Sequence, residues 1–156
     1  MDEQDFTALE YHDQHFFDCF APVFEASAQL NEVTYYATIE SGFIQIIKLL
    51  FTCEKMSFPV YLKVNPDFDT IEIHGHFPET DDCYRSFIPQ TLWGEAIDNG
   101  LFWVWRIRNH QGYVDGIQFE FHNHLVIQIM GLASELITKR VVEETGIVCE
   151  WRTYEE

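Results

Sequence analysis

Basic residues are scarce in this 156-residue sequence, because nine Lys and Arg stand against 26 Asp and Glu and give a formal net charge of −17. A field of that sign repels polyanions, so we expect neither free nucleic acid nor an anionic membrane surface as a ligand. Long apolar runs are missing as well. The most apolar stretch, residues 43–51, is far shorter than the roughly 20 residues that span a bilayer, so we expect no membrane-spanning segment.

The cysteines are few and include no close pair; they are Cys19, Cys53, Cys83 and Cys149. A chain of this size with a good core does not depend on disulfides, so we expect four buried thiols in a reducing compartment. The acidic N-terminal sequence lacks the basic and then apolar start of a secretory signal. Together these features predict a cytoplasmic protein.

Signatures of catalysis are also absent from the sequence. It contains neither a glycine-framed serine nucleophile of the form G-x-S-x-G nor a glycine-rich phosphate loop. With 26 acids, some carboxylates lie close together in any fold, so acid pairs do not indicate a glycosidase. Asp67 and Asp69 fit the solvated tip of a hairpin, closed by an Asx turn, better than a calcium loop. We expect no enzymatic activity and no cofactor.

The sequence contains seven histidines, a residue type that often binds metal ions. His74 and His76 are two positions apart, as are His122 and His124, and residues two apart on a strand share a face. Zinc or nickel would need a further ligand from another strand, and the sequence does not establish that pairing. Surface or half-buried histidines explain the pattern better, and a histidine-based metal-binding domain is kept as an alternative.

The residues that are present in abundance are apolar and aromatic, at 47% and 16% of the chain. This composition is enough for one large core, and we predict a single domain over residues 1–156. Apolar residues at near-helical spacing predict a helix within residues 1–30. We expect Pro22 to end or break that helix, with a shorter helical piece at 23–30.

Most of the remaining sequence predicts strands. Apolar and polar residues alternate, or apolar runs occur, at residues 33–40, 43–53, 58–64, 70–76, 101–108, 117–122, 125–132 and 147–152. The intervening residues 78–100 are expected to cross irregularly, with a short helix near 91–99. The predicted fold class is therefore α+β, with a mainly antiparallel sheet of about eight or nine strands, an N-terminal helix and a short middle helix.

Two hairpins are expected within this sheet, one over residues 58–76 and one over residues 101–122. In the second hairpin we expect Arg106 and Arg108 to share a face with Glu120 and His122, where opposite charges stabilise the strand pair.

The acidic charge is concentrated toward the N-terminal side, since residues 1–47 contain nine acids and no Lys or Arg. Such a surface often serves only solubility, but opposed charge also speeds association with a basic partner, and aromatic residues anchor interfaces. Two segments that are expected to be exposed loops combine acids with aromatic residues. The candidate partner-binding residues are Asp81, Asp82 and Tyr84 in the first segment and His110, Tyr113 and Asp115 in the second.

A small, strongly acidic α+β chain with many aromatic residues and no catalytic signature resembles the immunity proteins of bacterial polymorphic-toxin systems. The segment 101–134 carries Trp103-Val104-Trp105 and the loop Asn109-His110-Gln111-Gly112-Tyr113-Val114-Asp115. It also resembles small bacterial domains of uncharacterised function that share an N-x-Q-G-Y-x-D hairpin loop.

The resemblance to immunity proteins implies a cytoplasmic inhibitor that occludes the active site or substrate channel of a cognate, basic toxin. It transfers no functional residue. An alternative function is a nucleic-acid mimic that inhibits a DNA- or RNA-acting enzyme. The sequence also leaves a homo-oligomer open, because an edge strand can pair with a second copy.

Overall fold

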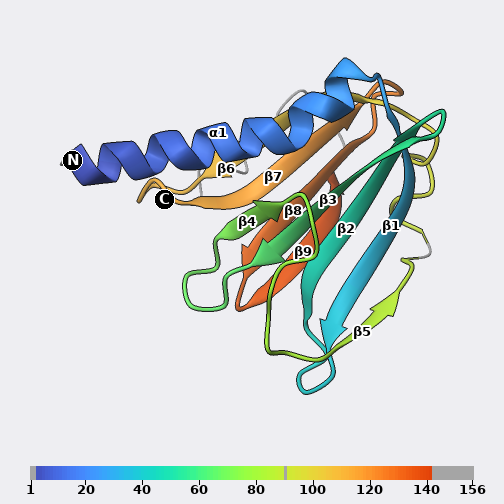
Figure 1. The fold of residues 1–156 in the computed structure, drawn as a ribbon. Helices are drawn as coiled ribbons and strands as arrows, with labels where there is room; N and C mark the ends of the chain where they lie inside the picture. Colours follow the sequence, from blue (N-terminus) through green and yellow to red (C-terminus); the bar gives the residue numbers. More distant parts are fainter. Residues whose placement is uncertain (1–2, 90, 142–156) are drawn as a thin grey trace.

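The computed structural model describes residues 3–89 and 91–141 of the chain, with one helix and nine strands in these ranges. The elements are α1 (Glu3–Glu25), β1 (Gln29–Thr38), β2 (Ile44–Cys53), β3 (Met56–Val64), β4 (Ile71–His74), β5 (Tyr84–Phe87), β6 (Leu101–Arg108), β7 (Val114–Phe121), β8 (Val126–Leu132) and β9 (Glu135–Val141). Their arrangement is shown in Figure 1. The α+β class that the sequence predicts is confirmed. No helix in the described part of the chain is long and apolar enough to cross a membrane.

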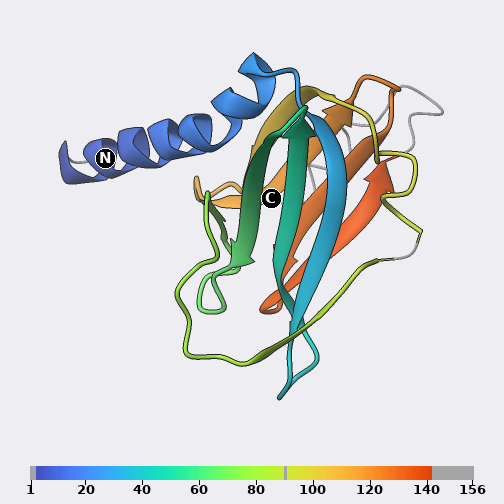
Figure 2. The ribbon, with the colours of Figure 1, turned by 45° about the vertical axis from the view of Figure 1, so that its right-hand side comes forward.

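The strands form two antiparallel sheets rather than one. A five-stranded sheet has the order β4-β3-β2-β1-β5, and a four-stranded sheet has the order β6-β7-β8-β9. The sheets lie face to face (Figures 1 and 2), with β2 in contact with β9 and β4 in contact with β7. This packing follows from period-two alternation, because each sheet has one apolar face that has to be buried.

One core fills the space between the sheets. Leu49 and Leu62 of the five-stranded sheet and Phe119 of the four-stranded sheet are fully buried there. Trp93, from the segment between β5 and β6, is buried among them, with its ring centroid 6.3 Å from that of Phe119. Its Nε1 donates a hydrogen bond of 2.7 Å to the Tyr35 hydroxyl, so the buried indole has a polar partner.

Helix α1 bridges the edge strands of the two sheets, β4 and β6. His15 Nε2 donates to the carbonyl oxygen of Ile73 in β4 over 2.6 Å. The guanidinium of Arg106 in β6 lies 4.8 Å from the ring centroid of Phe16. One turn further along the helix, Phe20 is buried, and its ring centroid is 6.0 Å from that of Phe119. The helix therefore fixes the position of β4 relative to β6.

Pro22 does not end the helix, so the part of the prediction that places a helix end there is wrong. Helix α1 continues through Pro22 to Glu25, and β1 begins at Gln29, so the separate helical piece predicted at 23–30 is wrong. A proline removes one amide donor, and near the C-terminal end of a helix that loss affects only the last turns. The Pro22 carbonyl still accepts a 3.0 Å hydrogen bond from the Ala26 amide. The ribbon changes direction in this last part of α1 (Figure 2).

The crossing between the sheets also differs from the prediction. Residues 91–98 form turns and no helix, so the short middle helix is wrong. The Asp98 amide donates to the Leu30 carbonyl over 2.7 Å, and the Asn99 carbonyl accepts from the Leu30 amide over 2.9 Å. These hydrogen bonds connect the end of the crossing to β1. The Asp98 amide therefore bonds to β1 and not to a carbonyl of its own segment. The crossing also contains β5, which pairs with β1 and was not predicted.

The β6–β7 hairpin forms, but its faces differ from the prediction. A bulge lies between Leu101 and Trp103, and the register then pairs Trp103 with Glu120 and Arg106 with Ile117. Directly paired residues share a face, so Trp103 lies with Glu120, and Arg106 lies on the opposite, core-facing side. The prediction that the arginines share a face with Glu120 is therefore wrong. Burial of the Ile117 and Phe119 side chains outweighs a surface charge pair worth at most about 1 kcal/mol.

Two further predictions concern the C-terminal part of the chain and the thiols. The strand predicted at 147–152 lies outside the described residues, as does Cys149, whereas β9 was not predicted. Cys19 and Cys53 are partly buried, but Cys83 is exposed in the loop before β5, so the prediction of four buried thiols is wrong for Cys83.

Candidate functional site

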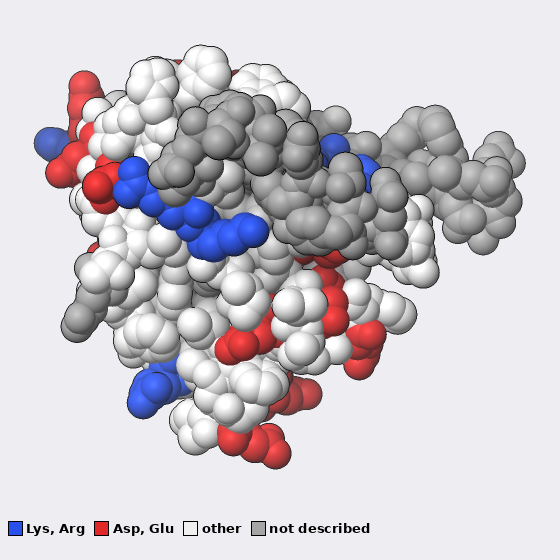
Figure 3. All heavy atoms as spheres, turned by 180° about the vertical axis from the view of Figure 1, so that it is seen from behind, with Lys and Arg blue, Asp and Glu red and all other residues white. Residues whose placement is uncertain are grey.

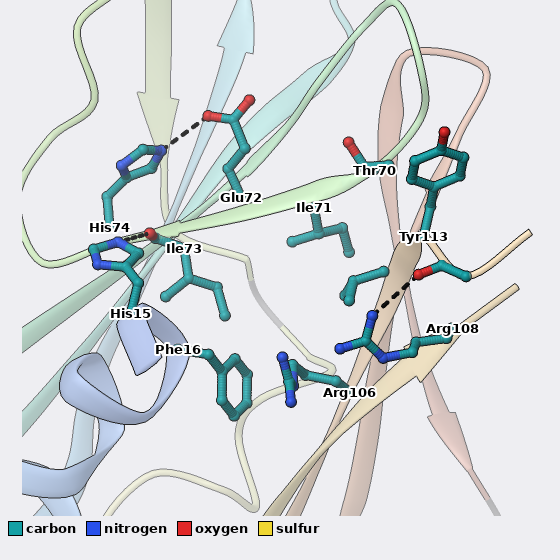
Figure 4. Close-up of a pocket in the computed structure, with 12 residues that line it drawn as sticks. His15, Phe16, Thr70, Ile71, Glu72, Ile73, His74, Arg106, Arg108 and Tyr113 are labelled. Atoms are coloured by element: carbon teal, nitrogen blue, oxygen red, sulfur yellow. Dashed lines mark hydrogen bonds and ion pairs between the residues drawn. The ribbon is translucent and has the colours of Figure 1, made fainter. Parts of the chain in front are cut away.

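A pocket of about 470 Å³ lies where α1 meets β4, β6 and the β6–β7 loop (Figure 4). Four segments that are far apart in the sequence line it. They are His15 and Phe16 of α1; Thr70, Ile71, Glu72, Ile73 and His74 at β4; Arg106 and Arg108 of β6; and Gly112, Tyr113 and Val114 of the loop and β7.

The two faces of β4 give the pocket an apolar wall and a polar rim. Ile71 and Ile73 point into the pocket toward Phe16, while Glu72 and His74 point to the other side of the strand (Figure 4). This division follows from the alternation of side chains along a strand. On the rim, His74 Nε2 is 3.1 Å from Glu72 Oε1, so the only carboxylate among the lining residues is held by a neighbouring imidazole.

The arginine side chains are held at the pocket by contacts from two different elements. Arg106 is stacked on the ring of Phe16, a cation–π arrangement. Arg108 Nη1 donates a hydrogen bond of 3.0 Å to the Gly112 carbonyl of the loop. His15 has its Nε2 proton directed at the Ile73 carbonyl, because a carbonyl oxygen can only accept. The pocket therefore has two arginines at one end, while its one lining carboxylate, on Glu72, lies on the other side of β4 with His74.

A second feature is an exposed aromatic strip, which we define as Phe24, Trp103 and Trp105. These side chains are 36%, 51% and 47% exposed. The ring centroid of Trp103 lies 6.2 Å from that of Phe24 and 6.1 Å from that of Trp105. Trp105 Nε1 donates a 3.0 Å hydrogen bond to Glu120 Oε1. The strip thus combines three large apolar rings with a carboxylate, and its two tryptophans lie on the face of β6 opposite to Arg106.

The first group of candidate partner-binding residues lies beside β5. Asp81 and Asp82 are exposed in the loop before this strand. Tyr84 is half-buried, with its ring centroid 6.3 Å from that of Phe77, and burial raises the pKa of its phenol, opposed by a hydrogen bond with Thr80. The first group therefore has two exposed carboxylates and one half-buried tyrosine ring that packs against Phe77.

The second group lies around the β6–β7 loop. His110 and Tyr113 are exposed, and Tyr113 is the member of the six candidates that lines the pocket. Asp115 is half-buried in β7, and burial raises the pKa of its carboxyl. Because β5 and β4 are opposite edges of the five-stranded sheet, and the loop borders β4, the structure does not bring the two groups together.

The hairpin tip between β3 and β4 is tied into the fold, which the sequence did not indicate. The predicted Asx turn is present, because Asn65 Oδ1 accepts a 3.0 Å bond from the Asp67 amide. The Asp69 carboxylate, however, accepts hydrogen bonds from the Ala133 amide at 3.1 Å and the Ser134 amide at 2.7 Å. Asp69 thus holds the β8–β9 turn of the other sheet and is not a solvated tip residue.

The histidine pairs occupy separate places. His74 and His76 lie at the β4 edge with ring centroids 6.3 Å apart, whereas His122 and His124 lie at the β7–β8 turn of the other sheet. Among the side chains that the structure describes, no group of three or more His, Cys, Asp or Glu is placed to hold a metal ion.

Sequence reasoning missed both the pocket and the strip. The pocket is assembled from four distant segments, so no local pattern marks it. One usable signal was the pair Arg106 and Arg108, two positions apart in a chain with only nine basic residues. For the strip, the alternation of Trp103 and Trp105 was visible, but the face on which they lie depends on the bulge after Leu101.

Comparison with known proteins places the chain beside a family without an assigned function. A family model described as "Family of unknown function (DUF6334)" matches residues 21–144. No curated protein and no solved structure matches the chain. The matched range contains all nine described strands and the last residues of α1, whereas His15 and Phe16 of the pocket precede it.

Proposed function

The chain belongs to the DUF6334 family of unknown function, and from its surface we propose that it is a protein-binding inhibitor, specifically an immunity protein that occludes the active site of a cognate, basic toxin. The observation that carries the proposal is the aromatic strip. Tryptophan rings supply much of the binding energy at protein interfaces, and monomeric proteins rarely keep several large aromatic rings exposed side by side.

The charge of the chain supports a basic partner. Glu120 lies at the strip itself, through its hydrogen bond with Trp105, and the chain as a whole carries a net charge of −17. The face shown in Figure 3 carries both acidic and basic side chains, so the attraction of a basic partner rests on the net charge of the whole chain. A partner with an excess of Lys and Arg would be attracted over a distance and then anchored on the rings.

The two groups of residues proposed from the sequence have different roles in this account. Asp81 and Asp82 lie beside β5, on a different sheet from the strip, so they contribute to the attracting field. His110 lies in the loop that follows β6, the strand that carries Trp103 and Trp105, and it extends the contact surface. An inhibitor of this kind acts in the cytoplasm of the cell that makes it.

Co-expression with the product of the neighbouring gene tests the proposal. We expect that product to be toxic when expressed alone, to co-purify with this chain and to lose its toxicity when both are present. The variant W103A/W105A should lose the rescue of growth, because it removes two anchors whose side chains are about half exposed.

The matched control is F68A, which truncates a 71% exposed ring in the turn between β3 and β4. F68A should rescue growth as the unchanged chain does. A neighbouring product that is neither toxic nor bound would overturn the proposed function, and full rescue by W103A/W105A would overturn the assignment of the strip. The mass of the free chain in solution, measured on the same samples, tests self-association through a strand edge.

A further inference from the structure

We propose that the pocket between α1, β4 and β6 binds a small organic anion, namely a carboxylate or a phosphate ester with an apolar body. This proposal is independent of the proposed function, because the pocket lies on the face of β6 opposite to Trp103. Its volume of about 470 Å³ is within the range of small-molecule sites, which extends over roughly 300–1,000 Å³.

The anionic group would be recognised by Arg106 and Arg108. Two positions apart on β6, they project from the same side of the strand and both line the pocket (Figure 4). A guanidinium has five N–H donors in one plane, so it can hold a ligand oxygen alongside contacts within the protein. Carboxylates and phosphates match that geometry, because their oxygens can accept two parallel hydrogen bonds from one guanidinium.

The orientation of both guanidiniums is set before a ligand arrives. Arg106 is stacked on Phe16 at 4.8 Å, and Arg108 is bonded to the Gly112 carbonyl at 3.0 Å. Side chains that are ordered in the unbound protein lose less conformational entropy on binding. The pocket is therefore organised for an anionic group at this end.

The apolar body of the ligand would lie against β4. Ile71 and Ile73 point into the pocket and are opposite Phe16 across it (Figure 4). The one carboxylate of the lining, on Glu72, points to the other side of β4, where His74 holds it at 3.1 Å. An anion in the pocket is thus kept apart from that like charge, and an apolar group finds a surface of aliphatic and aromatic side chains.

Calorimetric titration with four probes tests the proposal. Benzoate and phenyl phosphate carry both an anion and a ring, benzamide replaces the charge with a neutral group of similar shape, and inorganic phosphate lacks the ring. We expect benzoate or phenyl phosphate to bind at least about tenfold more tightly than benzamide, because charge-assisted hydrogen bonds are lost with the neutral probe. The preferred member of the pair identifies a carboxylate or a phosphate site.

Variants localise the binding to the pocket. R106Q and R108Q should each weaken binding of the preferred probe by at least about tenfold. The matched control is R85Q, because Arg85 is also stacked on a ring, that of Phe87 at 5.9 Å, but lies at the opposite edge of the five-stranded sheet. If R106Q does not fold, R106K and R108Q are measured instead. R106K keeps the positive charge of the side chain and loses the planar arrangement of guanidinium donors.

Three results would overturn the proposal. They are the absence of binding up to about 10 mM of either charged probe, equal affinity for benzamide and benzoate, and a loss with R85Q as large as that with R106Q. Failure of the toxin experiment leaves these titrations unaffected, so the two proposals fail separately.

Discussion

At the scale of single residues, Asp69 shows how one carboxylate joins the two sheets. Its oxygens accept hydrogen bonds from two consecutive backbone amides of the β8–β9 turn, Ala133 and Ser134. Both turn residues have positive φ, 53° and 66°, so the tight turn depends on interactions that compensate for this conformation. Asp69 therefore stabilises a turn that lies 64 positions away in the sequence.

Removing that carboxylate should destabilise the fold. We expect D69A to lower the free energy of unfolding by about 1–3 kcal/mol, because two backbone amides lose a charged acceptor. Urea denaturation followed by circular dichroism measures the change. The control is D67A, in the same turn, whose side chain is exposed and whose loss should cost less than about 0.5 kcal/mol. Equal losses for the two variants would contradict the role of Asp69.

Asp115 should make stability depend on pH in the opposite sense to a paired carboxylate. Burial raises the pKa of its carboxyl in the folded state, opposed by hydrogen bonds with its own backbone and with Asn109. Folding therefore favours the protonated form of the Asp115 carboxyl. Its contribution is fully present below the pKa of the unfolded chain and is lost as pH rises through the folded pKa.

We therefore expect the stability of D115N relative to the unchanged chain to increase between about pH 3 and about pH 7, since Asn cannot ionise. Urea denaturation at several pH values measures the difference, and D67N serves as a control with the same change of charge at an exposed site. A difference that stays constant over this range would contradict the account.

These two residues also show where prediction from sequence stops. The Asx turn at Asn65 was predictable, because the side chain bonds to an amide two positions along the chain. The partners of Asp69 were not, because they belong to another sheet. Asp115 was expected on an exposed loop, and only the packing of β7 shows that it is half-buried.

At the scale of elements, α1 is held to the sheets by a small number of buried rings. Phe20 is 2% exposed and lies against Phe119, whereas its neighbour Phe17 is 63% exposed on the same helix. We expect F20A to cost about 3–5 kcal/mol, because truncation leaves a cavity between helix and sheet. F17A should cost less than about 0.5 kcal/mol. Chemical denaturation measures both, and a small effect of F20A would show that α1 does not depend on this contact.

The elements that the sequence predicted well are those with a strong period. The strands that became β1, β2 and β3 alternate or are apolar on both faces, and a buried face requires that pattern. Short edge strands lack it, and β5 has three exposed residues out of four. The face of the β6 tryptophans was not predictable either, because a single bulge reverses the inward and outward positions.

At the scale of the whole molecule, charge and exposed aromatic residues act together. The net charge of −17 repels polyanions, and in the proposed function the same field attracts a basic protein toward the strip. The association rate with the proposed toxin should therefore fall as salt increases from about 0.05 to about 0.5 M, because the Debye length shortens. Stopped-flow fluorescence of the tryptophans measures this rate. An association rate that does not change with salt would contradict the proposed electrostatic attraction.

The proposed binding of a partner by the strip is tested by the dissociation constant of the complex with the neighbouring gene product. Isothermal titration calorimetry should compare the unchanged chain, W103A/W105A and F68A. We predict that W103A/W105A weakens binding by at least about 100-fold, because truncating a tryptophan that anchors an interface costs about 2 kcal/mol, or about 30-fold, and that F68A changes it by less than about twofold. A folded W103A/W105A protein that binds as tightly as the unchanged chain would contradict the claim.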